Sequence, residues 1–224
     1  MRAGDLEPSA AMPYEGRDSL VALMYRMTTT HRASRTLVLV PQYWGEFPVV
    51  GWDGEVLVRR YPLAEDTDLR AGTFDRVALH WVLDEVGRGR SRSDARALEL
   101  ALLREARRLV APGGRVVGLA ANWLCLGERE GRPVFGRSAT SCRRLLVRAG
   151  FEVGGVSIAV PSGDVPRSVI SAAPHASRHY FRRQLAFTKS GTDLPHMLLR
   201  RLLVEAGISR HLQGSLVFSG NAPC

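Results

Sequence analysis

The stretch LLREARRLVAPGGRVV, residues 102–117, carries the marks of a helix, a turn and a strand. Its first half repeats apolar residues at i, i+1, i+4, i+7 and i+8, which is typical of one face of an amphipathic helix. These apolar positions are Leu102, Leu103, Ala106, Leu109 and Val110. Pro112 cannot continue the helix, and Gly113-Gly114 can adopt the positive φ angles of a tight exit from it. Because Val116-Val117 then begin an apolar run typical of a buried parallel strand, the stretch predicts an α/β fold.

Apolar runs and helical patterns alternate along the rest of the chain. The predicted strands are residues 37–40, 49–53, 74–81, 115–122, 151–160 and 215–218, with 55–59 as a further candidate. The predicted helices are residues 18–27, 94–110, 141–149, 177–187 and 195–206, with a helical turn at 82–86. This alternation implies a doubly wound, mostly parallel sheet with helices on both faces. Ligands bind such sheets outside the carboxyl ends of the strands, so residues that directly follow strands are the candidate site.

The composition is that of a soluble globular protein, with 45% apolar and 24% charged residues in a chain of 224. We expect residues 1–34 to form an N-terminal segment with one short helix. Residues 35–224 are expected to form a single α/β domain, with a basic loop and helix insertion at about 161–210. No apolar run approaches the roughly 20 residues that span a bilayer, and the N-terminus lacks a signal-peptide pattern. A cytoplasmic location is therefore expected.

The formal net charge of +9 is concentrated in the C-terminal part of the chain. From Gly127 to the end there are 14 basic and 6 acidic residues, against 17 and 16 before it. A positive face can attract phosphates, nucleic acid or anionic membranes, so a basic phosphate- or nucleic-acid-binding module is one hypothesis. Lys189 is the only lysine, however, and this arginine skew is also typical of codon usage in a GC-rich genome. We therefore do not expect nucleic-acid binding.

Cysteines and histidines give little sign of a metal or of a disulfide framework. The three cysteines are odd in number and none has Cys-x-x-Cys spacing. His175 and His179 have the i, i+4 spacing of a metal pair, but no third ligand lies near them in the sequence. The basic stretch RHYFRR (178–183) fits an amphipathic helix with packed aromatics, or a surface that docks a phosphate-bearing acceptor or a membrane. We expect no metal.

Three segments occur in an order that resembles a known family. FDRVALHWVLDEV (74–86) follows an acidic loop, AEDTDLRAG (64–72), and precedes the helix–Pro-Gly-Gly–strand stretch at 102–117. RRLLVRAGFEV (143–153) then resembles a helix and "AGF" turn that lead into a further strand. In this order the segments are similar to class I S-adenosylmethionine-dependent methyltransferases of the type 11-like group. The resemblance implies a Rossmann-like sheet that ends in an antiparallel strand pair, and methyl transfer from S-adenosylmethionine to a small-molecule, glycan or secondary-metabolite acceptor.

The resemblance also implies a set of cofactor-binding residues. Asp53 matches the acid that binds the ribose hydroxyls, and Glu65 or Asp66 would match the acid near the adenine amine. Gly45 and Gly51 would belong to the cofactor loop. From the residues alone, Asp53 could equally well terminate a strand or cap a turn.

Residues after the later strands complete the candidate site. His80 would line the cofactor pocket, and it could act as the catalytic base if the acceptor is a hydroxyl. Trp81, Asn122 and Trp123 would contact the substrate. Packing in the core is the alternative for His80 and Trp81. The tryptophans at 44, 52, 81 and 123 all follow predicted strands, which favours a pocket at that edge of the sheet.

The cofactor loop departs from the pattern of the family. Its members have a glycine-rich turn after the first strand, where backbone approaches the cofactor. Here the sequence is VPQYWGEFPVVGWD (40–53), with only Gly45 before the next predicted strand. About eight residues between Val40 and Val49 are too few for a crossover helix, since a parallel connection takes a dozen or more. The alternative function is therefore an inactive methyltransferase-like fold that serves as a binding or assembly subunit beside a partner.

Overall fold

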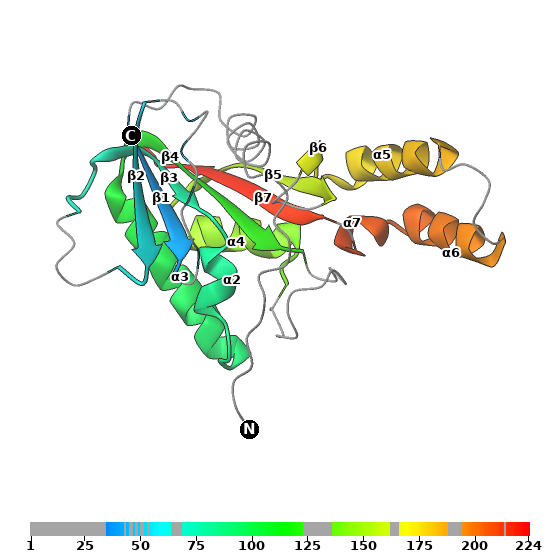
Figure 1. Cartoon of the computed structure of the whole chain (residues 1–224), viewed down its shortest axis with the longest axis horizontal. Helices are drawn as coiled ribbons and strands as arrows, with labels where there is room; N and C mark the ends of the chain where they lie inside the picture. Colours follow the sequence, from blue (N-terminus) through cyan, green and yellow to red (C-terminus); the bar gives the residue numbers. More distant parts are fainter. Residues whose placement is uncertain are drawn as a thin grey trace.

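The computed structural model of the chain describes residues 35–42, 44, 47, 49, 52, 54–63, 69–122, 136–161, 166–187, 194–212 and 214–224. Figure 1 shows the arrangement of their helices and strands. The predicted N-terminal segment 1–34, with its short helix, lies outside these residues.

Seven described strands form one mixed sheet in the order β2-β1-β3-β4-β7-β5-β6. The strands are β1 (Arg35–Pro41), β2 (Glu55–Tyr61), β3 (Phe74–Leu79), β4 (Val110–Ala121), β5 (Glu152–Pro161), β6 (Pro166–Ser171) and β7 (Ser215–Asn221). Strands β2, β1, β3 and β4 run parallel to one another, whereas β7 lies antiparallel between β4 and β5. The fold is therefore the Rossmann-like α/β fold predicted from the sequence, including the antiparallel strand near one edge.

The chain reverses its direction across the sheet between β1 and β3. From β1 the chain goes outward to β2, and it returns past β1 to β3 and then β4. The carboxyl ends of β1 and β3 therefore lie side by side where the two halves of the sheet diverge, and the backbone N–H of His80 donates to the carbonyl of Leu39 there (2.9 Å). In open α/β sheets such a switch point is where ligands bind.

Three helices cover one face of the sheet: α2 (Val82–Val86), α3 (Arg92–Leu109) and α4 (Ala139–Arg148). They pack over Leu39, Leu79, Val116 and Ala120, which alternate along their strands with residues of the other face. Helix α3 begins with Ser91 as its cap, because the Ser91 Oγ accepts from the backbone N–H of Asp94 (3.2 Å). The predicted helices at 94–110 and 141–149 are thus present, each shifted by about two residues at its start.

The opposite face of the sheet has a core of its own. Its buried residues are Val38, Val40, Ala78, Trp81, Val117, Leu119, Ala159 and Val217. Trp44, Phe47 and Trp52, from the connection between β1 and β2, pack against this cluster. Aromatic side chains that follow β1 therefore cover the sheet on the side away from α2, α3 and α4.

The joint between α3 and β4 is tighter than the sequence predicts. Instead of a separate turn over 111–114, β4 begins at Val110, directly after the helix. The register then shifts, since Phe74 pairs with Val110 while Arg76 pairs with Arg115. A Cβ on Gly114 would lie 2.8 Å from the Asp75 carbonyl oxygen, so only glycine allows the backbones to approach this closely.

The prediction of a strand at 49–53 is wrong at its described residues. Val49 and Trp52 lie outside any strand, and the second parallel strand is β2, Glu55–Tyr61. This leaves residues 42–54 for the connection, which is enough for a parallel crossover. Strand β2 lies at the edge of the sheet and is partly exposed, so its polar sequence EVLVRRY can form a strand.

The described residues between 174 and 212 form an arm that extends from the edge of the sheet (Figure 1). Strand β6 lies on that edge, and α5 (Pro174–Phe187), α6 (Leu194–Glu205) and α7 (Ser209–Leu212) follow it (Figure 1). Helices α5 and α6 lie side by side with Phe181 and Val204 buried, and the Arg182 Nε donates to Glu205 (2.8 Å). None of the described helices is long and apolar enough to cross a membrane.

Candidate functional site

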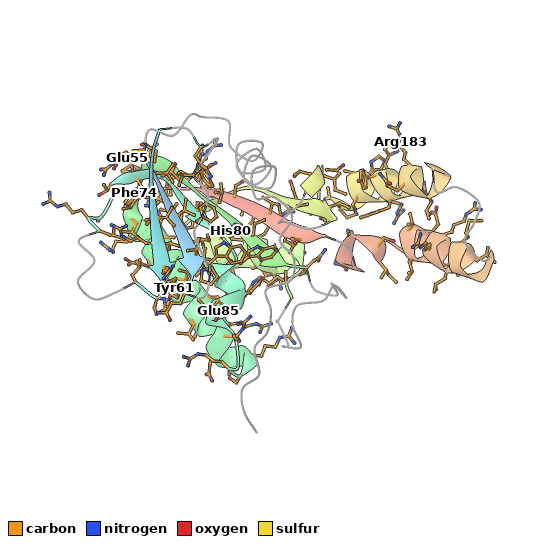
Figure 2. The ribbon with its side chains drawn as sticks, viewed as in Figure 1. Glu55, Tyr61, Phe74, His80, Glu85 and Arg183 are labelled. Carbon is orange, nitrogen blue, oxygen red and sulfur yellow. The ribbon has the colours of Figure 1, made fainter. Side chains whose placement is uncertain are left out.

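His80 lies at the carboxyl end of β3, at the switch point of the sheet (Figure 2). It is 2% exposed, and its ring is surrounded by aromatic side chains. The ring centroid of Trp44 is 4.8 Å away with the planes at 85°, and that of Phe47 is 5.0 Å away at 68°. The sequence placed His80 in the candidate pocket, and the structure adds that residues following β1 contact it directly.

Trp81 turns the chain from β3 into α2 in an unfavourable backbone conformation. Its φ of 59° makes it the one non-glycine residue with positive φ in the part of the chain that the structure describes. It is only 3% exposed and precedes α2 without a side-chain cap. A bulky residue held in the left-handed region carries strain, which concentrates at functional sites.

The aromatic side chains at the switch point form a set with a common chemistry. This aromatic cluster consists of Trp44, Phe47, Trp52, His80 and Trp81. Neighbouring rings meet edge to face, with Phe47 and Trp52 at 6.0 Å between centroids and His80 and Trp81 at 6.2 Å. Flat rings stack against a purine, and their π faces attract a cationic ligand group. The cluster therefore gathers side-chain types that can contact a purine or a cation.

Most of the residues predicted to bind the cofactor lie outside the described part of the chain. These are Gly45, Gly51, Asp53, Glu65 and Asp66, together with Trp123 of the predicted substrate site. The position of β2 nevertheless changes the interpretation of the acids. Because β2 begins at Glu55, Asp53 precedes the second parallel strand and does not end it. The acids that follow the carboxyl end of β2 in the sequence are Glu65, Asp66 and Asp68, and the first two were predicted to bind the cofactor.

Asn122 belongs to a different environment from His80. Residues alternate between the faces of β4, so Asn122 lies on the same side as Ala120 and α4, and not on the side of Leu119 and the aromatic cluster. It is 2% exposed, and its Nδ2 donates to the Arg210 carbonyl of α7 (2.6 Å). The structure thus keeps His80 and Trp81 together and separates Asn122 from them.

A buried polar network behind α2 was not predicted from the sequence. The guanidinium of Arg137 makes two hydrogen bonds to Glu99 of α3, and its Nη2 also donates to the Leu83 carbonyl (3.2 Å). Asp84 accepts from the backbone N–H of Ala121 (2.8 Å), which joins α2 to the end of β4. Glu99 lies on the apolar stripe of α3, four residues after Ala95 and three before Leu102. A carboxylate at such a position indicates a buried polar partner, and this pattern could have been used to predict the network from the sequence.

The charges of this network offset one another. Burial lowers the pKa of Arg137, but the hydrogen bond and the charge of Glu99 raise it, with a net rise. Burial raises the pKa of the nearby Cys142 thiol to about 12. Burial therefore disfavours the thiolate of Cys142, which is the nucleophilic form of a cysteine. The network therefore joins α2, α3 and the end of β4 through buried hydrogen bonds.

No protein-family model and no curated protein matches the chain. Solved structures are similar to the chain at low sequence identity, with TM-scores below 0.5. The cyclase SpnF is 14% identical, with a TM-score of 0.47 over 97% of this chain and 84% of that chain. An S-adenosylmethionine-dependent methyltransferase from Thermotoga maritima is 13% identical, with a TM-score of 0.45 over 91% and 87%. Another from Mesorhizobium loti is 12% identical, with a TM-score of 0.41 over 88% and 94%. Similarity at this level assigns neither an activity nor a substrate.

Proposed function

We propose that the protein is an S-adenosylmethionine-dependent methyltransferase that acts on a small-molecule or glycan acceptor. The observation that carries this proposal is the aromatic cluster at the switch point between β1 and β3. S-adenosylmethionine combines an adenine ring with a sulfonium cation, and stacking and cation–π attraction suit both groups. Trp44 and Phe47 lie directly against His80, and Trp52 lies beside Phe47.

Different residues of the chain would bind the different groups of the cofactor. Trp44, Phe47 and Trp52 hold the adenosine and sulfonium groups, while Glu65 or Asp66 accepts hydrogen bonds from the ribose hydroxyls. The position of Glu65 and Asp66 after β2 supports this role more than the position of Asp53 before it. Gly45 and Gly51 give the connection between β1 and β2 the freedom to follow the bound ligand.

The bound cofactor supplies a methyl group on a good leaving group, so the protein needs to align the acceptor and exclude water. His80 is 2% exposed and enclosed by aromatic rings, and therefore lies in a water-poor environment. If the acceptor is a hydroxyl, a ring nitrogen of His80 accepts its proton as the oxygen forms its new bond to carbon. Trp81, whose ring meets that of His80 edge to face, would help to hold the His80 ring in place.

Ligand binding must rearrange the aromatic cluster. The rings of Trp44 and Phe47 pack edge to face on His80, within 5.0 Å between centroids. An adenosine group that reaches His80 therefore displaces at least one of these rings. This movement changes the environment of a tryptophan, and we expect a change in tryptophan fluorescence when the ligand binds.

Titration calorimetry with S-adenosylhomocysteine tests the proposal. We expect the wild-type protein to bind and Trp44→Ala to weaken binding by about 1–3 kcal/mol, the range for losing one base–aromatic stack. His175→Ala is the matched control, because His175 is exposed on α5 away from the cluster, and it should leave the affinity unchanged. A wild-type protein that binds neither S-adenosylmethionine nor S-adenosylhomocysteine would refute the proposal and support the inactive-subunit alternative.

A further inference from the structure

A cavity of about 280 Å³ lies on the face of the sheet opposite the aromatic cluster. It opens between the end of β4, the first turn of α4, the start of α5 and helix α7. Its polar lining consists of Asn122, Thr140, Arg143, Arg210 and His211, along with the capping Ser138. An apolar wall from β5, β7 and the start of α5 completes it. The cavity is near the lower size limit of small-molecule sites.

The charged groups of this cavity all have the same sign. Arg143 comes from α4, and Arg210 and His211 come from α7. Strands β5 and β7 and the start of α5 contribute uncharged residues, and none of the described residues that line the cavity is acidic. Two arginines and a histidine therefore share a cavity without a carboxylate in its wall.

The surroundings of His211 favour its neutral form. The Arg210 Nε donates to the His211 Nε2 (3.0 Å), so that this nitrogen acts as an acceptor. Burial lowers the pKa of His211, and the positive charge of Arg210 lowers it further. Both effects favour the neutral form of the histidine beside Arg210.

The start of α4 adds donors to the same cavity. The Ser138 Oγ accepts from the backbone N–H of Ser141 (3.1 Å), and the first turn of α4 contains no acidic residue. The backbone N–H groups of Ala139 and Thr140 have no partner within the helix by their position. They add to the positive potential that the arginines create.

We propose that this cavity binds a small organic anion, with its phosphate or carboxylate group at Arg143, Arg210 and His211. The compact body of the ligand lies against Ile158 and Leu216 in the apolar wall. The site is separate from the aromatic cluster, because Asn122 and His80 lie on opposite faces of the sheet. The proposed anion site therefore does not depend on whether the protein uses S-adenosylmethionine.

The anion and a proton on His211 are linked. A bound anion supplies the negative charge that the wall lacks, so it raises the pKa of His211 from its lowered value. By linkage, the anion binds more tightly as the pH falls through the range in which His211 gains its proton.

Calorimetry with benzoate, phenyl phosphate and benzyl alcohol tests the proposal on the full chain. Benzoate stays ionised between about pH 6 and pH 8, so its own charge does not change with pH in this range. A rise in its affinity as the pH falls toward about 6 therefore reports the protonation of His211. The neutral benzyl alcohol should bind at least roughly tenfold more weakly than either anion. Tighter binding of phenyl phosphate than of benzoate assigns a phosphate ligand, and the reverse order assigns a carboxylate.

Variants locate the binding. Arg143→Ala should weaken anion binding by roughly tenfold, the loss expected for one charge-assisted hydrogen bond. Arg144→Ala is the matched control, since Arg144 is the next residue of α4, is exposed and does not line the cavity. Equal effects of the two variants, or anions that bind no better than benzyl alcohol, overturn the proposal. Arg143→Ala should leave the S-adenosylhomocysteine titration unchanged, which distinguishes failure of this site from failure of the cofactor site.

Discussion

Gly118 shows how a single residue fixes the distance between two strands. It lies in β4 directly opposite Phe218 of β7, whose ring packs over it. A Cβ built on Gly118 would be 2.8 Å from the Cε1 atom of that ring. Since Phe218 is 1% exposed and enclosed by the core, its ring has little room to move. The sequence shows this glycine only as part of an apolar run, because the contact joins residues a hundred positions apart.

Gly118→Ala should therefore lower the free energy of unfolding by about 1–3 kcal/mol, the usual cost of overpacking a core. Gly155→Ala in β5 is the matched control, because its Cβ would meet only the Ser219 Oγ at 3.8 Å. Urea denaturation of both variants measures the difference. A Gly118→Ala protein as stable as the control would contradict the packing described here.

At the scale of single elements, the sequence predicts buried helices and strands better than edge strands. Helices α3 and α4 were located within two residues, because their apolar stripes face the core. Strand β2, at one edge of the sheet, was predicted only as a further candidate at 55–59, and β6, at the other edge, was missed, because edge strands are less buried. Residues 161–176 were expected to form a loop from their Pro, Ser and Gly content, yet β6 occupies 166–171 with a proline as its first residue.

The ion pair between α3 and the segment before α4 determines how these elements are joined. Arg137 is 6% exposed and Glu99 is 2% exposed, and they hydrogen-bond at two positions. Arg137→Ala leaves the Glu99 carboxylate buried without its partner, which should cost about 3–5 kcal/mol of unfolding free energy. The double variant Glu99→Leu/Arg137→Met buries no charge there and should cost less than Arg137→Ala alone.

The exposed pair between Arg35 and Glu55 provides the control for this experiment. Their side chains are 44% and 62% exposed with 2.9 Å between Nε and Oε2, and Glu55→Ala should cost less than about 1 kcal/mol. Chemical denaturation of the set gives the ranking. If Arg137→Ala is no more harmful than Glu55→Ala, the buried pair does not stabilise the joint between the helices.

At the scale of the whole molecule, the order of the strands decides which residues can form one site. The sequence places His80, Trp81 and Asn122 at the same edge of the sheet, and all three are found after β3 and β4. The face of the sheet on which each side chain lies depends on the strand register. Asn122 lies on the face covered by α4, whereas His80 lies on the opposite face, in the aromatic cluster. The sequence places Trp44 at this edge, but the contribution of Phe47 could not be predicted, because it depends on how the connection after β1 folds back over the sheet.

The central claim is that the switch point between β1 and β3 binds an adenosine cofactor through the aromatic cluster. A crystal structure of the protein with S-adenosylhomocysteine tests it most directly. We predict the adenosine group between the carboxyl ends of β1 and β3, with the Trp44 ring or the Phe47 ring moved away from His80. A ligand bound elsewhere on the molecule, or no bound ligand at saturating concentration, would contradict the claim.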